Sequence, residues 1–365
     1  MKTDLADIFR HFRSEGTFLK GEPFGSGHIH DTYKITTAEE DQHNYILQRI
    51  NTNIFKDVEE LQNNIFQVTS HIRKKLSAIP GSDPDRETLT IIPSTDGKLF
   101  YRDDKGDYWR TYIFIERHRS YDKVETTEQA YQGGRAIGRF EMLIAGLDPS
   151  GIYEVLPGFH DMEMRLNNFY KVLEKDPENR AAAIQDDVQF VLDRAEEMMT
   201  IKRLGKEGKI PLRITHNDTK FNNVLLDEND RSLCVIDLDT VMPGYIHYDF
   251  GDAIRTTANS AFEDEKDLEK VFVRLDLYEA FARGFMEEVR NELNDTEIDY
   301  LPFSARMLTF IIGLRFITDY IDGDHYFKIH HPGHNLERAR AQFKLVKSME
   351  EHREEMEEII RRLKG

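Results

Sequence analysis

The pattern of hydrophobic and polar positions separates a β-rich first third of the chain from a helical remainder. Short runs in which apolar and polar residues alternate predict strands at residues 18–24, 29–35, 44–50, 89–92 and 108–115. Between the third and the fourth run, apolar residues recur in steps of three and four. This spacing predicts an amphipathic helix within residues 53–76, with its apolar stripe at Val58, Leu61, Ile65, Val68, Ile72 and Leu76.

The pattern changes after residue 116, where helical spacing dominates. It predicts helices at residues 127–145, 161–204, 262–290 and 336–363, with a short β region at 212–239. The chain therefore divides into a small β-rich lobe (residues 1–115) and a larger, mostly helical lobe (residues 116–365), joined by a hinge near residues 113–118. A length of 365 residues is enough for two such cores.

Composition and charge restrict the possible partners. The formal net charge of −18 makes nucleic acids and anionic membrane surfaces poor partners. The longest strongly apolar stretch, Met307–Leu314, is shorter than the roughly 20 residues of a membrane span. The first residues carry acids and no apolar signal-peptide core, so we expect a cytoplasmic protein. The single cysteine, Cys234, excludes an internal disulfide and a zinc-type spacing.

One stretch carries the residue types that phosphoryl transfer needs. It reads Ile214-Thr-His-Asn-Asp218-Thr-Lys-Phe-Asn-Asn223, and it continues after a polar turn with Val-Ile-Asp237-Leu-Asp239. The reaction needs a carboxylate for the proton of the attacking hydroxyl, an amide and a carboxylate for Mg²⁺, and a cation near the γ-phosphate of ATP. We assign these roles to Asp218 as base, Lys220 as cation, and Asn223 and Asp237 as metal ligands.

Alternatives exist for single residues of this stretch. Turn capping by Asp218 and Asn223, with His216 as a core histidine, explains each residue alone but not their joint spacing. Asp239 could be a further metal ligand or a residue that supports one. The Asp249-Phe-Gly sequence looks like a metal motif but lies too far from Asp218, so we expect Asp249 and Asp252 to cap the following helix and brace the loop.

The order His-x-Asp-x-Lys-x-x-Asn, followed by the acid at Asp237, resembles the catalytic loop of protein kinases. Asn217 stands where protein kinases have an arginine, as in the aminoglycoside phosphotransferase and choline kinase relatives that act on small molecules. The resemblance implies an α+β, protein-kinase-like two-lobe fold with a small β-rich N-lobe and a larger, mostly helical C-lobe. It also implies ATP and Mg²⁺ as cofactors.

The same resemblance directs attention to nucleotide-binding positions in the small lobe. The glycines of Gly25-Ser26-Gly27 would let the backbone approach phosphates, although a loop of this kind alone is also an ordinary hairpin. The hinge would place Phe114 and Ile115 at the nucleotide. Where kinases carry a phosphate-pairing lysine, this chain has Gln48 and Arg49, of which alternation turns only one toward the cleft. Glu59 or Glu60 is the possible helix partner.

Several longer segments resemble bacterial N-acetylhexosamine 1-kinases. They include Gly-His-Ile-His-Asp-Thr-Tyr, Leu-Gln-Arg-Ile-Asn-Thr-Asn-Ile-Phe, His-Asn-Asp-Thr-Lys-Phe-Asn-Asn-Val-Leu and Arg-Phe-Ile-Thr-Asp-Tyr, and the resemblance runs from Gly25 to Arg340. It implies phosphorylation of the anomeric hydroxyl of N-acetylglucosamine or N-acetylgalactosamine, with Asp218 taking the proton from O1. The sugar-binding residues that it implies are His28, His30, Asp218, Arg315 and Tyr326.

Two other functions remain open from the sequence. One is a kinase of the same fold that acts on an amino alcohol, choline or an aminoglycoside. The other is a non-catalytic nucleotide-binding relative, which the missing small-lobe lysine would allow. For Arg315 and Tyr326, the alternatives to sugar binding are a salt bridge and a core aromatic residue.

Overall fold

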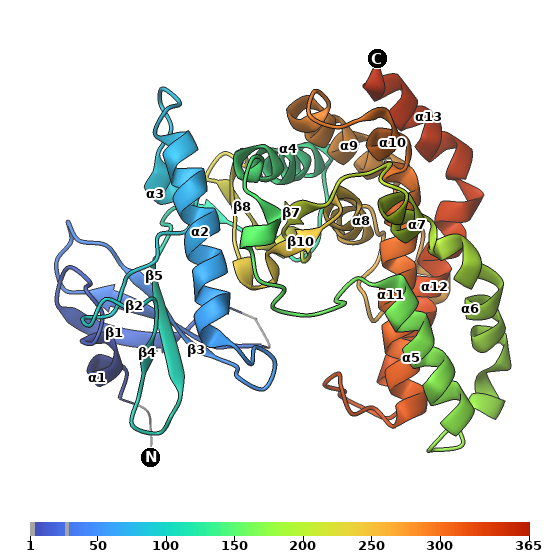
Figure 1. Ribbon diagram of the computed structural model, residues 1–365, viewed down its shortest axis with the longest axis horizontal. Coiled ribbons are helices and arrows are strands. Elements are labelled where there is room, and N and C mark those ends of the chain that lie inside the picture. The colour runs from blue at the N-terminus through green and yellow to red at the C-terminus, as the bar shows by residue number, and fades with distance from the viewer. Residues whose placement is uncertain (1–3, 26–28) are drawn as a thin grey trace.

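A computed structural model describes residues 4–25 and 29–365, and it shows two lobes of unequal size (Figure 1). The small lobe is built on one five-stranded antiparallel sheet of order β1-β2-β3-β5-β4. Its strands are β1 (Phe18–Pro23), β2 (Asp31–Thr37), β3 (Tyr45–Ile50), β4 (Tyr101–Arg102) and β5 (Tyr108–Ile113). Four of the five predicted strands are therefore present. Residues 89–92 form hydrogen bonds with β5 but no strand, because Pro93 has no N–H to extend the ladder.

The two faces of this sheet have different neighbours. The outer face packs on α1 (Leu5–Phe9) in an apolar cluster of Ile8, Phe9, Phe12, Ile35, Tyr45, Leu47 and Trp109. Strand register pairs Arg49 with Trp109 and Gln48 with Arg110, so these two pairs point to opposite faces. Gln48 and Arg110 therefore face the large lobe.

Helix α2 (Val58–Leu76) lies between the sheet and the large lobe (Figure 1). It begins five residues later than the predicted range because Asp57 caps it, accepting a hydrogen bond from the backbone N–H of Glu60. Its predicted apolar stripe is buried in the main core. A short helix, α3 (Pro84–Glu87), follows it.

The large lobe is mostly helical. Its longer helices are α4 (Thr127–Ile144), α5 (Met162–Lys175), α6 (Gln185–Met198), α7 (Thr200–Lys206), α8 (Ile246–Thr257), α9 (Leu275–Val289), α11 (Leu301–Asp322), α12 (His334–Glu351) and α13 (Arg353–Lys364), with the short α10 (Asp295–Asp299) before α11. Helices α4 and α9 pack closely at their glycines. A Cβ added at Gly134 would lie 2.1 Å from the carbonyl oxygen of Phe281, so only glycine permits this approach.

Several helix predictions need correction. The predicted helix 161–204 is interrupted after Lys175 by the left-handed Asp176, and the C-terminal helix is divided at His352. Of the range 262–290, residues 275–289 form an α-helix and residues 268–270 a single 3-10 turn. Helix α11 was not predicted. By length and composition it could cross a membrane, but it is the central helix of the large lobe, and 83% of its most apolar window is buried.

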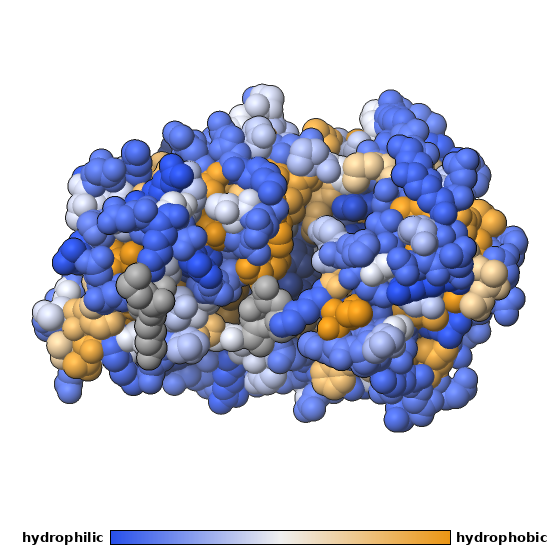
Figure 2. Space-filling view, turned by 90° about the horizontal axis from the view of Figure 1, so that it is seen from below, coloured by the Kyte–Doolittle hydropathy of each residue, from blue (hydrophilic) through white to orange (hydrophobic). Residues whose placement is uncertain are grey.

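Two small sheets of the large lobe hold the loops of the candidate site. One pairs β7 (Arg213–Thr215) with β10 (Met242–Gly244). The other contains β6 (His118–Arg119), β8 (Val224–Asp227) and β9 (Ser232–Val235). The loops after β7 and after β9 open toward the small lobe, where the molecular surface is hollowed between the two lobes and partly lined by hydrophobic residues (Figure 2).

Candidate active site

The loop after β7 is held by α8. The Asp249 carboxylate accepts hydrogen bonds of 2.6 Å from the backbone N–H groups of both His216 and Asn217. The Thr219 hydroxyl donates to the Asp249 carbonyl at 2.6 Å. The predicted brace is therefore present. The predicted cap is wrong, because α8 already begins at Ile246 and Asp249 lies inside its first turn.

His216 joins this loop to the loop after β9. Its Nδ1 accepts from the backbone N–H of Asp218 at 3.2 Å, so Nε2 carries the hydrogen that it donates to the Ile236 carbonyl at 2.9 Å. The Ile236 N–H in turn donates to the carbonyl of Asn223 at 2.9 Å. Asp237 follows directly, so the backbone brings Asp218, Asn223 and Asp237 to one place.

The side chains of Asp218, Lys220 and Asn223 are in contact. The Lys220 ammonium lies 3.0 Å from Oδ2 of Asp218, and these side chains are 36% and 24% exposed. The Asn223 amide nitrogen donates to the Asp218 carbonyl at 2.8 Å and to Oδ2 at 3.2 Å. Burial favours a higher pKa for Asp218, but Lys220, with His216 and Arg255 nearby, holds that pKa below its ordinary value. Asp218 is thus an ionised carboxylate that can accept a proton.

Asp237 has the properties of a cation ligand. Its backbone is left-handed, with φ +65°, an uncommon conformation for a residue other than glycine. Burial raises the pKa of its carboxyl, and repulsion from Asp239 and Asp218 raises it further. No hydrogen bond offsets this cost within the part of the chain described here. A bound cation would do so.

The residues of this site fit a magnesium ion that is bound jointly by the protein and by the phosphates of a nucleotide. Mg²⁺ is commonly bound by one or two carboxylates plus phosphate oxygens and water. Asp237 supplies a carboxylate, and Asn223 supplies its amide oxygen because its hydrogen bonds use the amide nitrogen. Over residues 4–25 and 29–365, no three His, Cys, Asp or Glu side chains gather as a metal site. The pair therefore fits a metal that arrives with the nucleotide.

Asp239 does not fit the predicted role of metal ligand. Both of its oxygens bind the guanidinium of Arg110, with Arg110 Nη2 at 2.7 Å from Oδ2. His30 Nε2 lies 2.5 Å from the same oxygen. Arg110 and His30 lower the pKa of Asp239 strongly against the effect of burial. The predicted sugar ligand His30 is thus engaged with Asp239 between the lobes.

Arg110 was missed in the sequence. A charged residue inside the aromatic run Tyr108-Trp-Arg-Thr-Tyr112 was the available signal, because a buried strand carries such a residue only with a partner. Gln48 accepts a hydrogen bond from Arg110 Nε at 2.9 Å, and its amide nitrogen donates to the hydroxyl of Thr32 at 3.0 Å.

Of the two candidates Gln48 and Arg49, the structure turns Arg49 away from the site. Its guanidinium lies on the outer side of the sheet, where it binds Asp31 and, at 3.2 Å, Asp107. The predicted helix partners also lie elsewhere, since Glu59 is exposed and Glu60 half-buried. Gln48 is the residue of this strand that faces the site.

The other small-lobe predictions lie around the hinge. Gly25 has φ +80° and open space where a Cβ would be, whereas Ser26, Gly27 and His28 fall outside the described residues. Phe114 lies under the Lys34 ammonium at 3.7 Å and meets Phe24 edge-on at 5.4 Å between ring centroids. Ile115 is buried. Phe24, Lys34 and Phe114 thus form an aromatic and cationic patch beside the hinge.

A group of cations and aromatic rings lies beside His160, which contacts the residue before Asp218. His160 Nε2 donates to the carbonyl of Asn217 at 2.8 Å, which ties the segment before α5 to the residue preceding Asp218. The Arg315 guanidinium lies 5.2 Å from the ring of Phe159 and 5.3 Å from that of Phe327. Its Nη2 is 3.4 Å from the Tyr326 hydroxyl. Tyr326 is 68% exposed, so it is no core residue.

Arg165 is a second cation beside Arg315. It donates to the carbonyl of Phe159 at 2.8 and 3.2 Å, and burial together with repulsion from Arg315 lowers its pKa to about 10. In the described chain no carboxylate forms an ion pair with either arginine, so the predicted alternative of a salt bridge for Arg315 does not hold. Two guanidinium groups without an ion pair among the described residues therefore lie near His160, which binds the residue before Asp218.

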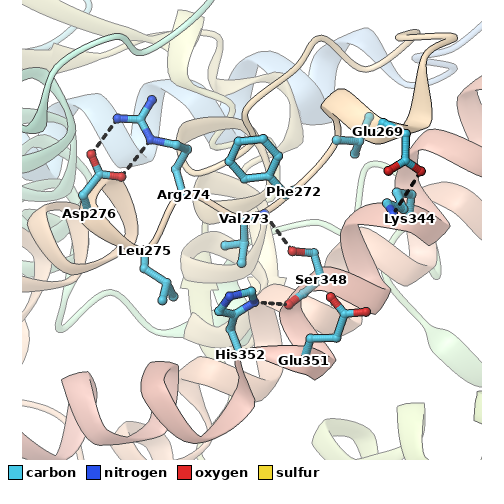
Figure 3. Close-up of a pocket in the computed structure, with 11 residues that line it drawn as sticks. Glu269, Phe272, Val273, Arg274, Leu275, Asp276, Lys344, Ser348, Glu351 and His352 are labelled. Carbon is cyan, nitrogen blue, oxygen red and sulfur yellow. Dashed lines mark hydrogen bonds and ion pairs between the residues drawn. The ribbon is translucent and has the colours of Figure 1, made fainter.

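A separate cavity lies elsewhere in the large lobe. It has a volume of about 470 Å³ and lies between residues 269–276 and helix α12 (Figure 3). Four of its charged residues are paired with each other, Arg274 with Asp276 at 2.6 Å and Lys344 with Glu269 at 3.8 Å. None of the residues discussed above lines it. We therefore place the candidate site at Asp218.

Comparisons with known proteins agree with this geometry. Residues 20–288 match the model of a family described as phosphotransferase enzyme family. An aminoglycoside phosphotransferase from Alicyclobacillus acidocaldarius is similar with a TM-score of 0.64 at 10% identity, covering 98% of each chain. A microcompartment-associated aminopropanol kinase is similar with a TM-score of 0.60 at 14% identity, over 96% of this chain and 97% of that one.

An amicoumacin kinase in complex with AMP-PNP, Ca²⁺ and Ami is also similar, with a TM-score of 0.57 at 15% identity, over 91% of this chain and 88% of that one. At such identities the similarity establishes the fold. The predicted protein-kinase-like two-lobe fold is confirmed.

Proposed function

Because the chain belongs to the phosphotransferase enzyme family, we propose that it is an ATP-dependent kinase that phosphorylates the anomeric hydroxyl of N-acetylhexosamines. The family accounts for small-molecule phosphoryl transfer. The choice of acceptor rests on the resemblance of several segments to N-acetylhexosamine 1-kinases and on one structural observation, the uncompensated charge of Arg165 and Arg315. Since ATP is made and used in the cytoplasm, we place the reaction there.

In the proposed reaction each residue of the site has one task. Asp218 accepts the proton of the sugar O1 as that oxygen attacks the γ-phosphate, and Lys220, 3.0 Å from Asp218, stabilises the charge that develops on the phosphoryl oxygens. Asn223 and Asp237 would hold Mg²⁺, which supplies positive charge to the phosphates of the nucleotide. Gly25 and the aromatic patch of Phe24, Lys34 and Phe114 would contact the nucleotide.

The arginines favour a neutral acceptor over a cationic one. An aminoglycoside or an amino alcohol carries ammonium groups at neutral pH and would meet two guanidinium groups that form no ion pair among the described residues. An acetamido sugar is neutral, and its hydroxyl and carbonyl oxygens accept hydrogen bonds from arginine. The rings of Phe159, Tyr326 and Phe327 around Arg315 offer apolar faces for the sugar ring.

An acceptor screen tests the proposal. Purified protein with ATP and Mg²⁺ is offered N-acetylglucosamine, N-acetylgalactosamine, choline, aminopropanol and an aminoglycoside, and ADP release is measured. We expect turnover with the N-acetylhexosamines and none with their 1-O-methyl glycosides, which lack the attacking hydroxyl. Turnover of a methyl glycoside would contradict attack by O1. A best substrate among the cations would favour the second candidate, an amino alcohol or aminoglycoside kinase, which is the activity named for two of the similar structures.

A further inference from the structure

Arg110 connects the two lobes through a buried ion pair. It projects from β5 of the small lobe, is 2% exposed, and binds both oxygens of Asp239 in the large lobe. His30, in the segment before β2, binds Oδ2 of Asp239 at 2.5 Å and accepts the Asn51 N–H at 3.0 Å through its other ring nitrogen. Two small-lobe side chains therefore hold one large-lobe carboxylate across the interface.

This ion pair lies next to the strand β3, where protein kinases would carry the lysine of a lysine–glutamate pair. The inward-facing residue of β3 is the neutral Gln48, which binds Arg110 Nε at 2.9 Å. On the buried side of α2, Gln62 is neutral, and neither end of its amide has a partner among the described residues. The positive charge on the inner face of the sheet is thus supplied one strand further along, by Arg110, and its acid comes from the large lobe.

The pair also separates the tasks of two neighbouring acids. Asp239 has both oxygens occupied by Arg110, and one of them also by His30. The side chain of Asp237, two positions earlier, forms no hydrogen bond or ion pair among the described residues, and the charges around it include Asp239, Asp218, Lys220, His216 and Arg110. A cation brought near these acids would find Asp237 available and Asp239 engaged.

We propose that Arg110 is a positioning residue for the nucleotide and its metal: by binding Asp239 it holds the small-lobe sheet over the large lobe and leaves Asp237 with Asn223 as the metal-binding pair. Asp239 is then an anchor and no metal ligand. The inference rests on the proposed kinase chemistry, but it does not depend on which acceptor is phosphorylated.

Nucleotide binding tests the positioning role without an acceptor. We expect Arg110→Met to raise the calorimetric dissociation constant for AMP-PNP with Mg²⁺ by about 10- to 100-fold, the usual effect of removing a residue that supports a metal site. Arg110→Lys should have an intermediate effect, because lysine keeps the charge but loses the paired geometry. Arg49→Met is the matched control. Arg49 lies on the adjacent strand in an ion pair with Asp31 that stays within the small lobe, so binding should not change.

A metal-binding experiment separates an anchor from a ligand. Binding of Mn²⁺ in the presence of AMP-PNP is followed by electron paramagnetic resonance for Asp237→Asn, Asp239→Asn and Arg110→Met. If Asp239 were a ligand, Arg110→Met would free its carboxylate, and Mn²⁺ affinity would stay the same or rise. If Asp239 is an anchor, Asp239→Asn and Arg110→Met should each weaken Mn²⁺ binding. The double variant should then bind Mn²⁺ no more weakly than the weaker-binding of the two single variants. Asp237→Asn should abolish it.

The double variant distinguishes a loss of folding from a loss of the positioning role. Arg110→Met leaves the buried Asp239 carboxylate with His30 as its remaining partner among the described residues, which lowers thermal stability, and Asp239→Asn in the same chain removes that charge. We expect the double variant to regain melting temperature but not nucleotide affinity. Recovery of both, or AMP-PNP binding by Arg110→Met within twofold of wild type, would overturn the proposal. Failure of the wild-type protein to bind AMP-PNP would instead overturn the proposed kinase function.

Discussion

Asp218 is the residue on which the proposed chemistry depends most directly. Because Lys220, His216 and Arg255 hold its pKa low against the effect of burial, its carboxylate is ionised at neutral pH. Asp218→Asn keeps the shape of the side chain but removes the proton acceptor, so kcat should fall by about 10²- to 10⁴-fold. AMP-PNP binding, measured by calorimetry, should be largely kept. Turnover near the wild-type rate on the best substrate would show that another group is the base.

Glu141 is a buried acid behind the same loop. It is 5% exposed, its Oε1 has no partner among the described residues, and burial together with the neighbouring Asp249 raises its pKa well above the ordinary value. The folded protein therefore keeps a proton that the unfolded chain releases above pH of about 4.3. Its contribution to stability is complete below that pH and is lost as pH rises toward the folded-state pKa.

Glu141→Gln should remove this pH dependence, because glutamine is neutral and can still donate to Asp249. We expect the variant to match wild type near pH 4 and to become progressively more stable than wild type toward pH 8, by up to about 1.4 kcal/mol per pH unit. Urea unfolding at a series of pH values measures it. The exposed Glu196→Gln is the control. Parallel pH profiles for wild type and Glu141→Gln would show that Glu141 is ionised in the folded protein.

The residues that the sequence predicted and those that it missed differ in where their partners lie. Asp218, Lys220, Asn223 and Asp237 sit within one short stretch, so their spacing alone placed them together. Arg110 acquires its role only through Asp239, which is 129 positions away. Arg165 matters because it lies beside Arg315, which comes from another helix. Neither partnership leaves a local pattern in the sequence.

The contact between helices α4 and α9 depends on the absence of side chains. A Cβ at Gly134 would come within 2.1 Å of a backbone oxygen of α9, and one at Gly284 within 2.1 Å of the Tyr131 carbonyl oxygen on α4. Gly134→Ala should therefore force the helices apart and lower the free energy of unfolding by about 1–3 kcal/mol or more. Thermal unfolding followed by circular dichroism measures this change.

Gly151→Ala serves as the control for this substitution. Gly151 has an ordinary φ, and the nearest atom to an added Cβ is 4.0 Å away. Its melting temperature should stay close to that of wild type. If Gly134→Ala were as stable as Gly151→Ala, the helices could separate at no cost, and the close packing would not be required.

The periodicity of apolar residues predicted the elements that bury one face. It missed the elements that are buried on all faces. The stripe of α2 appeared at its helical spacing because its other side meets water. Helix α11 is buried on nearly every side, so its apolar residues show no stripe to detect. The run at 89–92 had the alternation of a strand, but the proline at 93 limits it to a few hydrogen bonds with β5.

At the scale of the whole molecule, α2 belongs to the small lobe by sequence and to the large lobe by contact. Lys75 donates to the carbonyls of Met142 and Ala145 at 2.9 and 2.6 Å. Asn64, which is buried, donates to the carbonyls of Tyr153 at 2.7 Å and Val241 at 3.2 Å. Helix α2 therefore connects the small-lobe sheet, against which it packs at Ile50 and Tyr112, to the large lobe.

Asn64 makes the connection testable. Asn64→Ala removes its two hydrogen bonds to carbonyls and a third, of 2.9 Å, from the Tyr153 N–H, which should cost about 1–3 kcal/mol. It should also uncouple the lobes. Trp109, the only tryptophan in the sequence, reports on the small-lobe sheet by fluorescence, whereas far-ultraviolet circular dichroism reports mainly on the helices of the large lobe.

Wild type should unfold in urea with coincident transitions by both signals. The control Gln189→Ala should do the same, because it loses only an exposed contact within α6. In Asn64→Ala the fluorescence transition should move to lower urea than the circular dichroism transition, because the sheet then loses part of its support from α2. Coincident transitions in this variant would mean that the lobes are held together mainly by Arg110 and Asp239.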